Sequence, residues 1–299
     1  MLKIAFPGLG IGPFDVNRVA FSLFGRDVAW YGVIICVGML LAFFYGCHTI
    51  KKEKISTDDF LNILLFLIPF GIIGARLMHV VVNLDYYSTK PFLEVIAIWN
   101  GGGAIYGSII AGILVIIVYS RVRRLKILAV LDAFAPCVLI GQCIGRWGNF
   151  VNGEAFGTET TLPWGMFLSS TGKIHHPTFL YESLWTLSMF LFIHFFLYRK
   201  KKYDGEILFF YLGFYGLGRA IVEAFRADFS FPVFGMRFSM LVALAAFLLF
   251  GTLFVLGFAR AKQQPEKTAE TEEPVSTDTP QNESPKNPTD ESETDHDLT

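Results

Sequence analysis

The residues of this chain that could do chemistry are charged side chains set within long apolar stretches. They are Arg76, Asp132, Arg146, Glu182, Arg219 and Glu223. Ionisable groups inside an apolar membrane segment are costly to bury, so they are usually paired and mark functional sites. Arg219 and Glu223 are four residues apart and would share a helix face, which Arg226 extends by another turn. An ion pair that only fixes the helix register is the alternative interpretation.

Arginines outnumber the carboxylates expected beside them. Arg76, Arg146 and Arg219 together exceed what the buried carboxylates can neutralise. A surplus of guanidinium in a low-dielectric cavity favours an anion, and the planar fork of this group matches phosphate oxygens. In a membrane, the anion at hand is a phospholipid headgroup.

The run from Gly145 to Gly157, GRWGNFVNGEAFG, is the most unusual stretch of the chain. Its glycines permit left-handed turns and close approach of the backbone. Arg146, Asn149 and Glu154 supply a cation, an amide and a carboxylate. A flexible turn would explain the glycines but not these three side chains together.

Two adjacent histidines, His175 and His176, end the loop that follows. They indicate a metal only weakly, because no second pair of ligands has matching spacing. We therefore predict no metal site. We expect His176 to hydrogen-bond Glu182 or an anionic headgroup.

The composition is that of a membrane protein, with 53% hydrophobic and 17% charged residues among 299. A helix that spans a bilayer needs about 20 mostly apolar residues. Seven stretches meet this need, at about 28–48, 60–83, 103–119, 127–145, 178–198, 206–225 and 238–258. The predicted fold class is an all-α polytopic membrane protein with seven transmembrane helices.

Basic residues gather in alternate loops of this predicted bundle. They lie in 49–59, 120–126 and 199–205, and in Arg260 and Lys262 after the last span. The positive-inside rule assigns these segments to the cytosol, with the N-terminus outside and the C-terminus cytosolic. Tyr31, Tyr106 and all the buried charges except Asp132 then map to the outer half of the membrane. We interpret Asp132, near the basic loop 120–126, as a structural pairing residue.

Three regions follow from this organisation. We expect an extracytoplasmic N-terminal segment over 1–27 and a membrane-embedded catalytic domain over 28–258, with an extracytoplasmic loop over 146–177. Residues 259–299 would form an acidic cytosolic tail. From 262 onward it has 11 Asp and Glu against three Lys and Arg, a composition typical of disorder.

Taken together, the polar motifs resemble those of the bacterial prolipoprotein diacylglyceryl transferases. Gly145–Gly157 is similar to that family's signature G-R-x-G-N-F-x-N-x-E-x-x-G. The sequence HPTFLYE at 176–182 resembles its H-P-[ST]-x-x-Y-E, and 219–226 resembles its R-x-x-[IV]-E-x-x-R. WYG at 30–32 and GAR at 74–76 match its W-Y-G and G-x-R. The resemblance runs in order from about residue 28 to 258.

The resemblance implies a specific reaction in the bacterial plasma (inner) membrane. The diacylglyceryl group of phosphatidylglycerol would pass to the lipobox cysteine of a prolipoprotein at the outer leaflet, releasing glycerol phosphate. The implied partners are this lipid, the prolipoprotein signal peptide and the bilayer, with no nucleic acid and no cofactor. The predicted catalytic residues are Arg146, Arg219, Tyr106 and Tyr31. The predicted lipid-binding residues are Arg76, Arg146, Asn149, Glu154, Gly157, His176, Glu182, Glu223 and Arg226.

One position departs from the family pattern. Many members carry a histidine after the glycine run, proposed as the base, whereas Tyr106 follows Gly101–Gly103 here. A free phenol has a pKa of about 10 and is poorly matched to act as a base at neutral pH. Either nearby arginines activate Tyr106, or it only positions substrate and another group takes the thiol proton.

Two other classes of protein share some of these features. A lipid scramblase or headgroup transporter would also place arginines near one leaflet, but it needs a polar path to the cytosolic side. The third and seventh stretches offer little of such a path. A seven-helix receptor has the same number of spans without needing surplus arginines. The sequence therefore favours the transferase.

Overall fold

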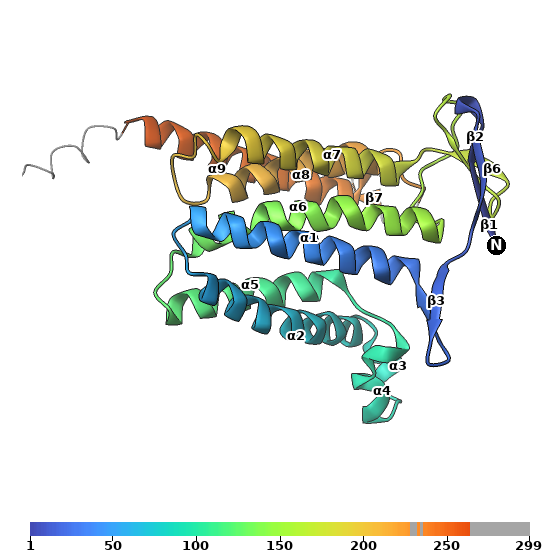
Figure 1. Cartoon of the computed structure of the whole chain (residues 1–299), viewed down its shortest axis with the longest axis horizontal. Helices are drawn as coiled ribbons and strands as arrows, with labels where there is room; N and C mark the ends of the chain where they lie inside the picture. The colour runs from blue at the N-terminus through green and yellow to red at the C-terminus, as the bar shows by residue number, and fades with distance from the viewer. Residues whose placement is uncertain (228–231, 234–235, 264–299) are drawn as a thin grey trace, which may run out of the picture. The chain divides into compact units, whose positions relative to one another are not determined.

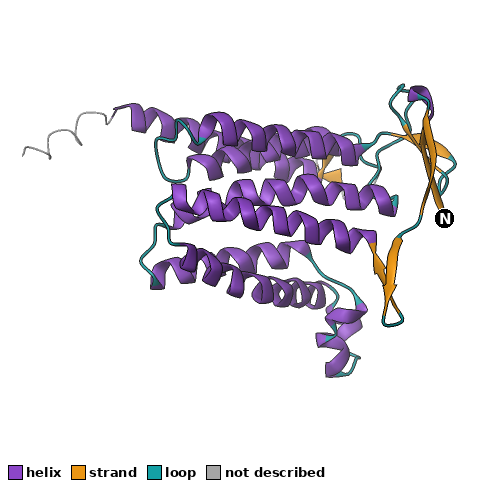
Figure 2. Cartoon of the chain, viewed as in Figure 1, coloured by secondary structure: helices purple, strands orange, loops and turns teal. Residues whose placement is uncertain are grey.

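The structure, a computed structural model of the 299-residue chain, describes residues 1–227, 232–233 and 236–263. Long helices lie side by side, and most of the strands gather at one of their ends, near the N-terminus (Figures 1 and 2). Most of the predicted acidic tail, from residue 264 onward, lies outside the described residues.

Six described helices are long and apolar enough to cross a membrane. They are α1 (Trp30–Lys52), α2 (Thr57–Val82), α5 (Ile105–Val122), α6 (Ile127–Asn152), α7 (Thr178–Phe192) with its π-helical extension η3 (Ile193–Leu197), and α9 (Phe238–Gln263). Helix α8 (Glu206–Glu223) coincides with the sixth predicted stretch, but its 18 residues include Glu206, Arg219 and Glu223. The prediction of a mostly helical polytopic protein is confirmed.

Helix α6 extends into the glycine-rich run, for which a flexible turn was the alternative interpretation. It ends at Asn152, past residue 145, where the predicted stretch stopped. Gly145 and Gly148 are helical, and Gly153 alone takes the left-handed conformation that ends the helix, with φ of 63°. Arg146 and Asn149 therefore lie on the last turns of a rigid helix.

The prediction of an all-α protein is incomplete, because segments outside the bundle form three small sheets. The strands are β1 (Leu2–Phe6), β2 (Ile11–Val16), β3 (Val19–Leu23), β4 (Arg26–Ala29), β5 (Met166–Leu168), β6 (Lys173–His175), β7 (Pro232–Val233) and β8 (Met236–Arg237). They pair in the orders β2-β1-β5-β6, β3-β4 and β7-β8. Strands this short carry too few residues for an alternating pattern to be recognised in the sequence.

The largest sheet joins the N-terminal segment to the loop after α6. Ile4 of β1 lies opposite Leu168 of β5 in an antiparallel pair. Ile4 and Leu168 are fully buried, and they share a small core with Met166 and with Phe179 from the start of α7. The sheet is therefore anchored to the bundle at the beginning of α7.

The helices of the bundle pack closely in pairs. Helix α1 packs along α6, and α2 packs along α5. Gly74 of α2 and Gly107 of α5 face each other so tightly that a methyl group on Gly107 would lie 2.1 Å from the Gly74 carbonyl oxygen. Small residues of this kind let helix backbones approach in membranes. Four short helical turns, η1 (Pro7–Leu9), α3 (Leu84–Tyr87), α4 (Phe92–Ile96) and η2 (Ile98–Asn100), complete the connections.

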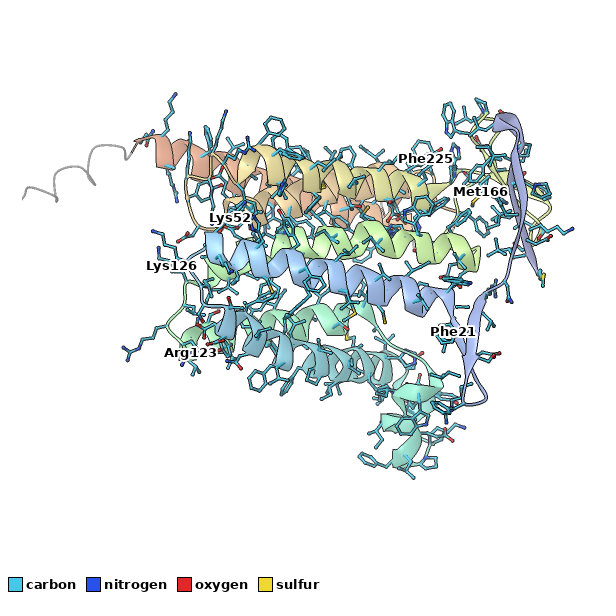
Figure 3. The ribbon with its side chains drawn as sticks, viewed as in Figure 1. Phe21, Lys52, Arg123, Lys126, Met166 and Phe225 are labelled. Atoms are coloured by element: carbon cyan, nitrogen blue, oxygen red, sulfur yellow. The ribbon has the colours of Figure 1, made fainter. Side chains whose placement is uncertain are left out.

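Basic side chains lie at the end of the helices opposite the sheet, where Figure 3 labels Lys52, Arg123 and Lys126, away from Met166. Within this end, Asp132 is fully buried. Its carboxylate accepts the backbone N–H groups of Gly205 and Leu208, at 2.7 and 2.8 Å, which caps the start of α8.

The cation beside Asp132 is Lys201, with its Nζ 2.8 Å from Asp132 Oδ2. Glu53, after α1, binds the same ammonium group. Burial disfavours the charge on Lys201, but Asp132 and Glu53 outweigh it and hold the pKa of Lys201 above its usual value. Asp132 is thus paired as predicted, but with Lys201 rather than with loop 120–126.

Replacing Asp132 by alanine should destabilise the protein strongly. The Asp132→Ala variant leaves Lys201 without its most buried partner and the first turn of α8 without its cap. Breaking a buried pair in this way costs about 3 to 5 kcal/mol. Thermal unfolding in detergent measures the loss, and Asp58→Ala, at an exposed position, should stay within about 0.5 kcal/mol. Equal stability of the two variants would contradict this role.

Candidate active site

Four arginines and two glutamates from neighbouring elements meet near the sheet end of the bundle. We call this set the arginine cluster: Arg146 on α6, Glu182 on α7, Arg219 and Glu223 on α8, Arg226 just after α8, and Arg237 on β8. Figure 3 labels Phe225, the neighbour of Arg226, at the same end as Met166 of the sheet.

Glu182 is the centre of this cluster. Its Oε1 accepts Nη1 of Arg219 at 2.8 Å and Nη1 of Arg226 at 3.4 Å, while its Oε2 pairs with Nη2 of Arg146. The side chain of Glu182 is 8% exposed. One buried carboxylate therefore holds three guanidinium groups from two other helices and the segment after α8.

Glu223 forms the second anionic point. Its Oε2 lies 2.8 Å from Nη2 of Arg219, and its Oε1 accepts the Ser239 hydroxyl at 2.6 Å. Nη1 of Arg237 lies 3.8 Å from the same Oε1. Arg219 thus bridges both glutamates, which fixes its guanidinium between α7 and α8.

The charges in the cluster do not balance. Among the described residues, four arginines lie beside two glutamates, so guanidinium groups outnumber carboxylates, as expected from the sequence. Arg237 was missed, because the sequence gives no helical spacing that relates it to Arg219 or Glu223. Its Nη2 donates to the Arg226 carbonyl at 2.6 Å, whereas its buried Nη1 has no hydrogen-bond partner in the part of the chain that the structure describes.

Gly157 holds the segment after α8 in place. Its N–H donates to the His176 carbonyl at 2.9 Å, and the next N–H, of Thr158, donates to the Phe225 carbonyl at 2.7 Å. A methyl group on Gly157 would lie 2.6 Å from both His176 Cβ and the Phe225 carbonyl oxygen. Only glycine lets the loop approach closely enough to fix Arg226 beside Glu182.

The remaining polar residues of the signature brace the end of α6. Glu154 Oε1 accepts the side-chain amides of Asn149 and Asn152, both at 3.1 Å. Trp147 donates its indole N–H to Ser183 on α7 at 3.2 Å. These bonds link α6 to its cap and to α7 on either side of Arg146.

His176 has a different hydrogen-bond partner from the predicted Glu182, and its contact with a headgroup stays a prediction. Its Nδ1 shares a hydrogen bond with the Tyr181 hydroxyl at 3.2 Å, and its ring packs on Phe225 at 5.0 Å between centroids. No hydrogen bond to Glu182 is present among the described residues. Burial lowers the pKa of His176 below its usual value.

The two predicted tyrosines differ in their surroundings. The Tyr31 ring packs on α6, where a methyl group on Gly148 would lie 2.7 Å from it. This places Tyr31 within one turn of Arg146. Tyr106, at the start of α5, is 67% exposed and has no hydrogen bond within the described ranges. The structure therefore gives no sign that an arginine activates its phenol.

Arg76 does not join the arginine cluster. It is buried, and its guanidinium donates to the backbone carbonyls of Glu94, Val95, Gly101 and Gly102, at 2.5 to 3.2 Å. Its group also lies over the Tyr87 ring at 5.1 Å. In this structure, Arg76 fixes the connection between α4 and α5, including the glycine run before Tyr106.

Comparison with known proteins assigns the chain to a family. The family described as prolipoprotein diacylglyceryl transferase has a sequence model that matches residues 18–256. The chain belongs to this family. The match to the prolipoprotein diacylglyceryl transferases spans β3 to α9 and so includes every residue of the arginine cluster.

Curated relatives agree with this assignment, and each is named phosphatidylglycerol–prolipoprotein diacylglyceryl transferase. The protein of Finegoldia magna is 44% identical over 77% of this chain and 91% of its own length. That of Clostridioides difficile is 39% identical over 77% and 90%. That of Lactococcus lactis is 43% identical over 71% and 84%. The transferase family resemblance inferred from the motifs is thus confirmed.

A methyl group at Gly157 should loosen the loop that holds Arg226. We expect Gly157→Ala to lower the unfolding free energy by about 1 to 3 kcal/mol, as overpacking does, and to speed amide exchange at Thr158. Gly141→Ala is the control, because a methyl group at this helical position meets nothing within 4 Å. It should leave stability unchanged or raise it by up to about 1 kcal/mol. Unchanged exchange at Thr158 in Gly157→Ala would contradict the proposed fit.

Proposed function

We propose that this protein transfers the diacylglyceryl group of phosphatidylglycerol to the lipobox cysteine of prolipoproteins, forming a thioether and releasing glycerol phosphate. The observation that carries this proposal is the surplus of guanidinium in a partly buried cluster, in a chain of the prolipoprotein diacylglyceryl transferase family. Among the described residues, the guanidinium groups outnumber the carboxylates at that site, which favours an anionic ligand, and phosphate suits the forked donors.

In the membrane, we infer that α8 is the seventh spanning helix. Its charged residues do not prevent this, because Glu206 is buried and Arg219 and Glu223 are paired inside the bundle. Buried, paired charges are the form in which spanning helices carry them. The basic loops would face the cytosol, with the sheet and the arginine cluster at the outer leaflet of the bacterial plasma membrane and the tail inside.

The first step of the proposed reaction is capture of the phosphate by Arg146 and Arg219. A guanidinium has five N–H donors, so each arginine can donate to a phosphate oxygen, and a bound phosphate would weaken its contact with Glu182. Arg226 and Glu223 would support this clamp. Asn149, Glu154, Gly157 and His176 would shape the loop above it, and Arg76 would hold the segment that ends at Tyr106.

The chemical step joins a thiol to a carbon atom of the lipid. The cysteine sulfur forms a bond to the terminal carbon of the diacylglyceryl group while the bond from that carbon to the phosphate oxygen breaks. Negative charge therefore moves from sulfur onto the phosphate. Guanidinium groups already placed on the phosphate oxygens stabilise this charge without having to reorganise. Tyr31 and Tyr106 would position the lipid and the peptide at the mouth of the site.

Removing either clamping arginine should slow transfer strongly. We expect Arg146→Ala and Arg219→Ala each to lose about 10² to 10³ in rate, the usual effect of removing one preorganised donor. Mass spectrometry of a lipobox peptide incubated with phosphatidylglycerol measures the thioether formed. Membrane insertion of both variants is the control. Rates near those of the unmodified protein in either variant would overturn the clamp.

The phenol of Tyr106 should matter little for the chemical step. Because it is exposed and without a hydrogen-bond partner among the described residues, we expect Tyr106→Phe to keep at least about a third of the rate. General acid–base catalysis contributes about 10² to 10⁴ in rate. A loss of more than tenfold in the same assay would instead assign a chemical role to the phenol.

A further inference from the structure

The proposed reaction needs a group that accepts the proton of the cysteine thiol. We propose that Glu182 is this base, and that binding of the lipid phosphate frees its carboxylate to act. The inference rests on the proposed transfer reaction, and it assigns the step for which Tyr106 is poorly suited.

Other candidate bases are engaged in hydrogen bonds or lie away from the arginines of the cluster. Tyr106 is two-thirds exposed and has no activating partner within the described ranges. The Nδ1 of His176 is engaged by Tyr181, and its ring is packed on Phe225. Glu154 accepts two amide groups at the end of α6. Within the described residues, none of these three makes a hydrogen bond or an ion pair with Arg146 or Arg219.

The two glutamates of the cluster differ in their partners, and this difference selects Glu182. Glu223 would keep Arg237 and the Ser239 hydroxyl even if Arg219 turned to another anion. The contacts of the Glu182 carboxylate all come from Arg146, Arg219 and Arg226 among the described residues. The Glu182 carboxylate is therefore bound by the same guanidinium groups that would bind a phosphate.

Phosphate binding would change the electrostatic surroundings of Glu182. A phosphate oxygen competes for the arginine N–H groups, and each ion pair that weakens raises the affinity of the carboxylate for a proton. Among the described residues, the titratable side chain of Tyr215 also lies near Glu182, in a narrow crevice between α7 and α8 that Trp185 and Arg219 line as well. A bound phosphate would thus take over N–H groups that now hold the Glu182 carboxylate, which leaves that carboxylate available to the thiol proton.

The step balances in atoms and charge. The thiol proton passes to the Glu182 carboxylate, and the sulfur electron pair forms the bond to the lipid carbon. The electrons of the breaking carbon–oxygen bond stay on the phosphate, which leaves as glycerol phosphate bearing one more negative charge. That phosphate can then take the proton from Glu182 as it departs, which restores the carboxylate to its three arginines.

The test is Glu182→Gln in the full-length protein, assayed with dioleoyl phosphatidylglycerol and a lipobox peptide. Glutamine keeps the shape of the side chain but cannot accept the proton. We expect the rate at saturating substrates and pH 7 to fall by about 10² or more, while phosphatidylglycerol binds as tightly as before or more tightly. The residual rate should rise about tenfold per pH unit up to the thiol pKa, about 8.5, because only preformed thiolate reacts. The unmodified protein should show a flat profile over this range.

Two further variants make the outcome decisive. Glu159→Gln, an exposed carboxylate paired with Lys173, is the matched control and should leave rate and profile unchanged. Glu182→Asp should keep a rate that does not change with pH, at a reduced level. This variant tests the inference if the glutamine variant does not fold.

A rate for Glu182→Gln within threefold of the unmodified protein would overturn the inference. So would loss of lipid binding in proportion to activity, since that is the result of a merely structural glutamate. Absence of thioether from the unmodified protein would overturn the proposed function itself.

Discussion

Two buried carboxylates shared among four guanidinium groups are the constraint on which the rest of the structure depends. Glu182 and Glu223 draw arginines from α6, α8, β8 and the segment after α8 to one point. A charge buried away from water is tolerated only when it is paired and hydrogen-bonded, so each helix must hold its register for the others to remain satisfied. The excess of guanidinium over carboxylate groups among the described residues is what suits the cluster to an anionic ligand.

The rest of the fold holds this point from two sides. At one end, Asp132 and Lys201 fix the start of α8, the helix that carries Arg219 and Glu223. At the other end, the close approach at Gly157 fixes Arg226, and the sheet is anchored at the start of α7, near Glu182. The cluster thus lies between two rigid attachments, which suits a site that must be preorganised for developing charge.

Much of this could be predicted from the sequence, for physical reasons that also mark the limit. Long apolar stretches determine helices, and the spacing of Arg219, Glu223 and Arg226 determines a shared face. For Glu182 and Arg146, the sequence indicated only that both side chains lie at the same depth in the membrane, and not that they form an ion pair. Arg237 could not be found, because nothing local relates it to its partner, and the short strands β1 and β5 depend on pairing across more than 160 residues. Arg76 was grouped with the other arginines because the position of a residue along a predicted helix gives its depth in the membrane. It does not give the side of the helix on which the residue lies.

The most direct test of the account is whether the purified protein converts phosphatidylglycerol and a lipobox peptide into a diacylglyceryl thioether. Mass spectrometry would quantify the modified peptide and the glycerol phosphate in one reaction. The account predicts both products in equal amounts, without an added cofactor. Phosphatidylglycerol retained by the protein with no thioether formed, while an active relative works under the same conditions, would contradict it and favour a protein that binds or moves lipid without changing it.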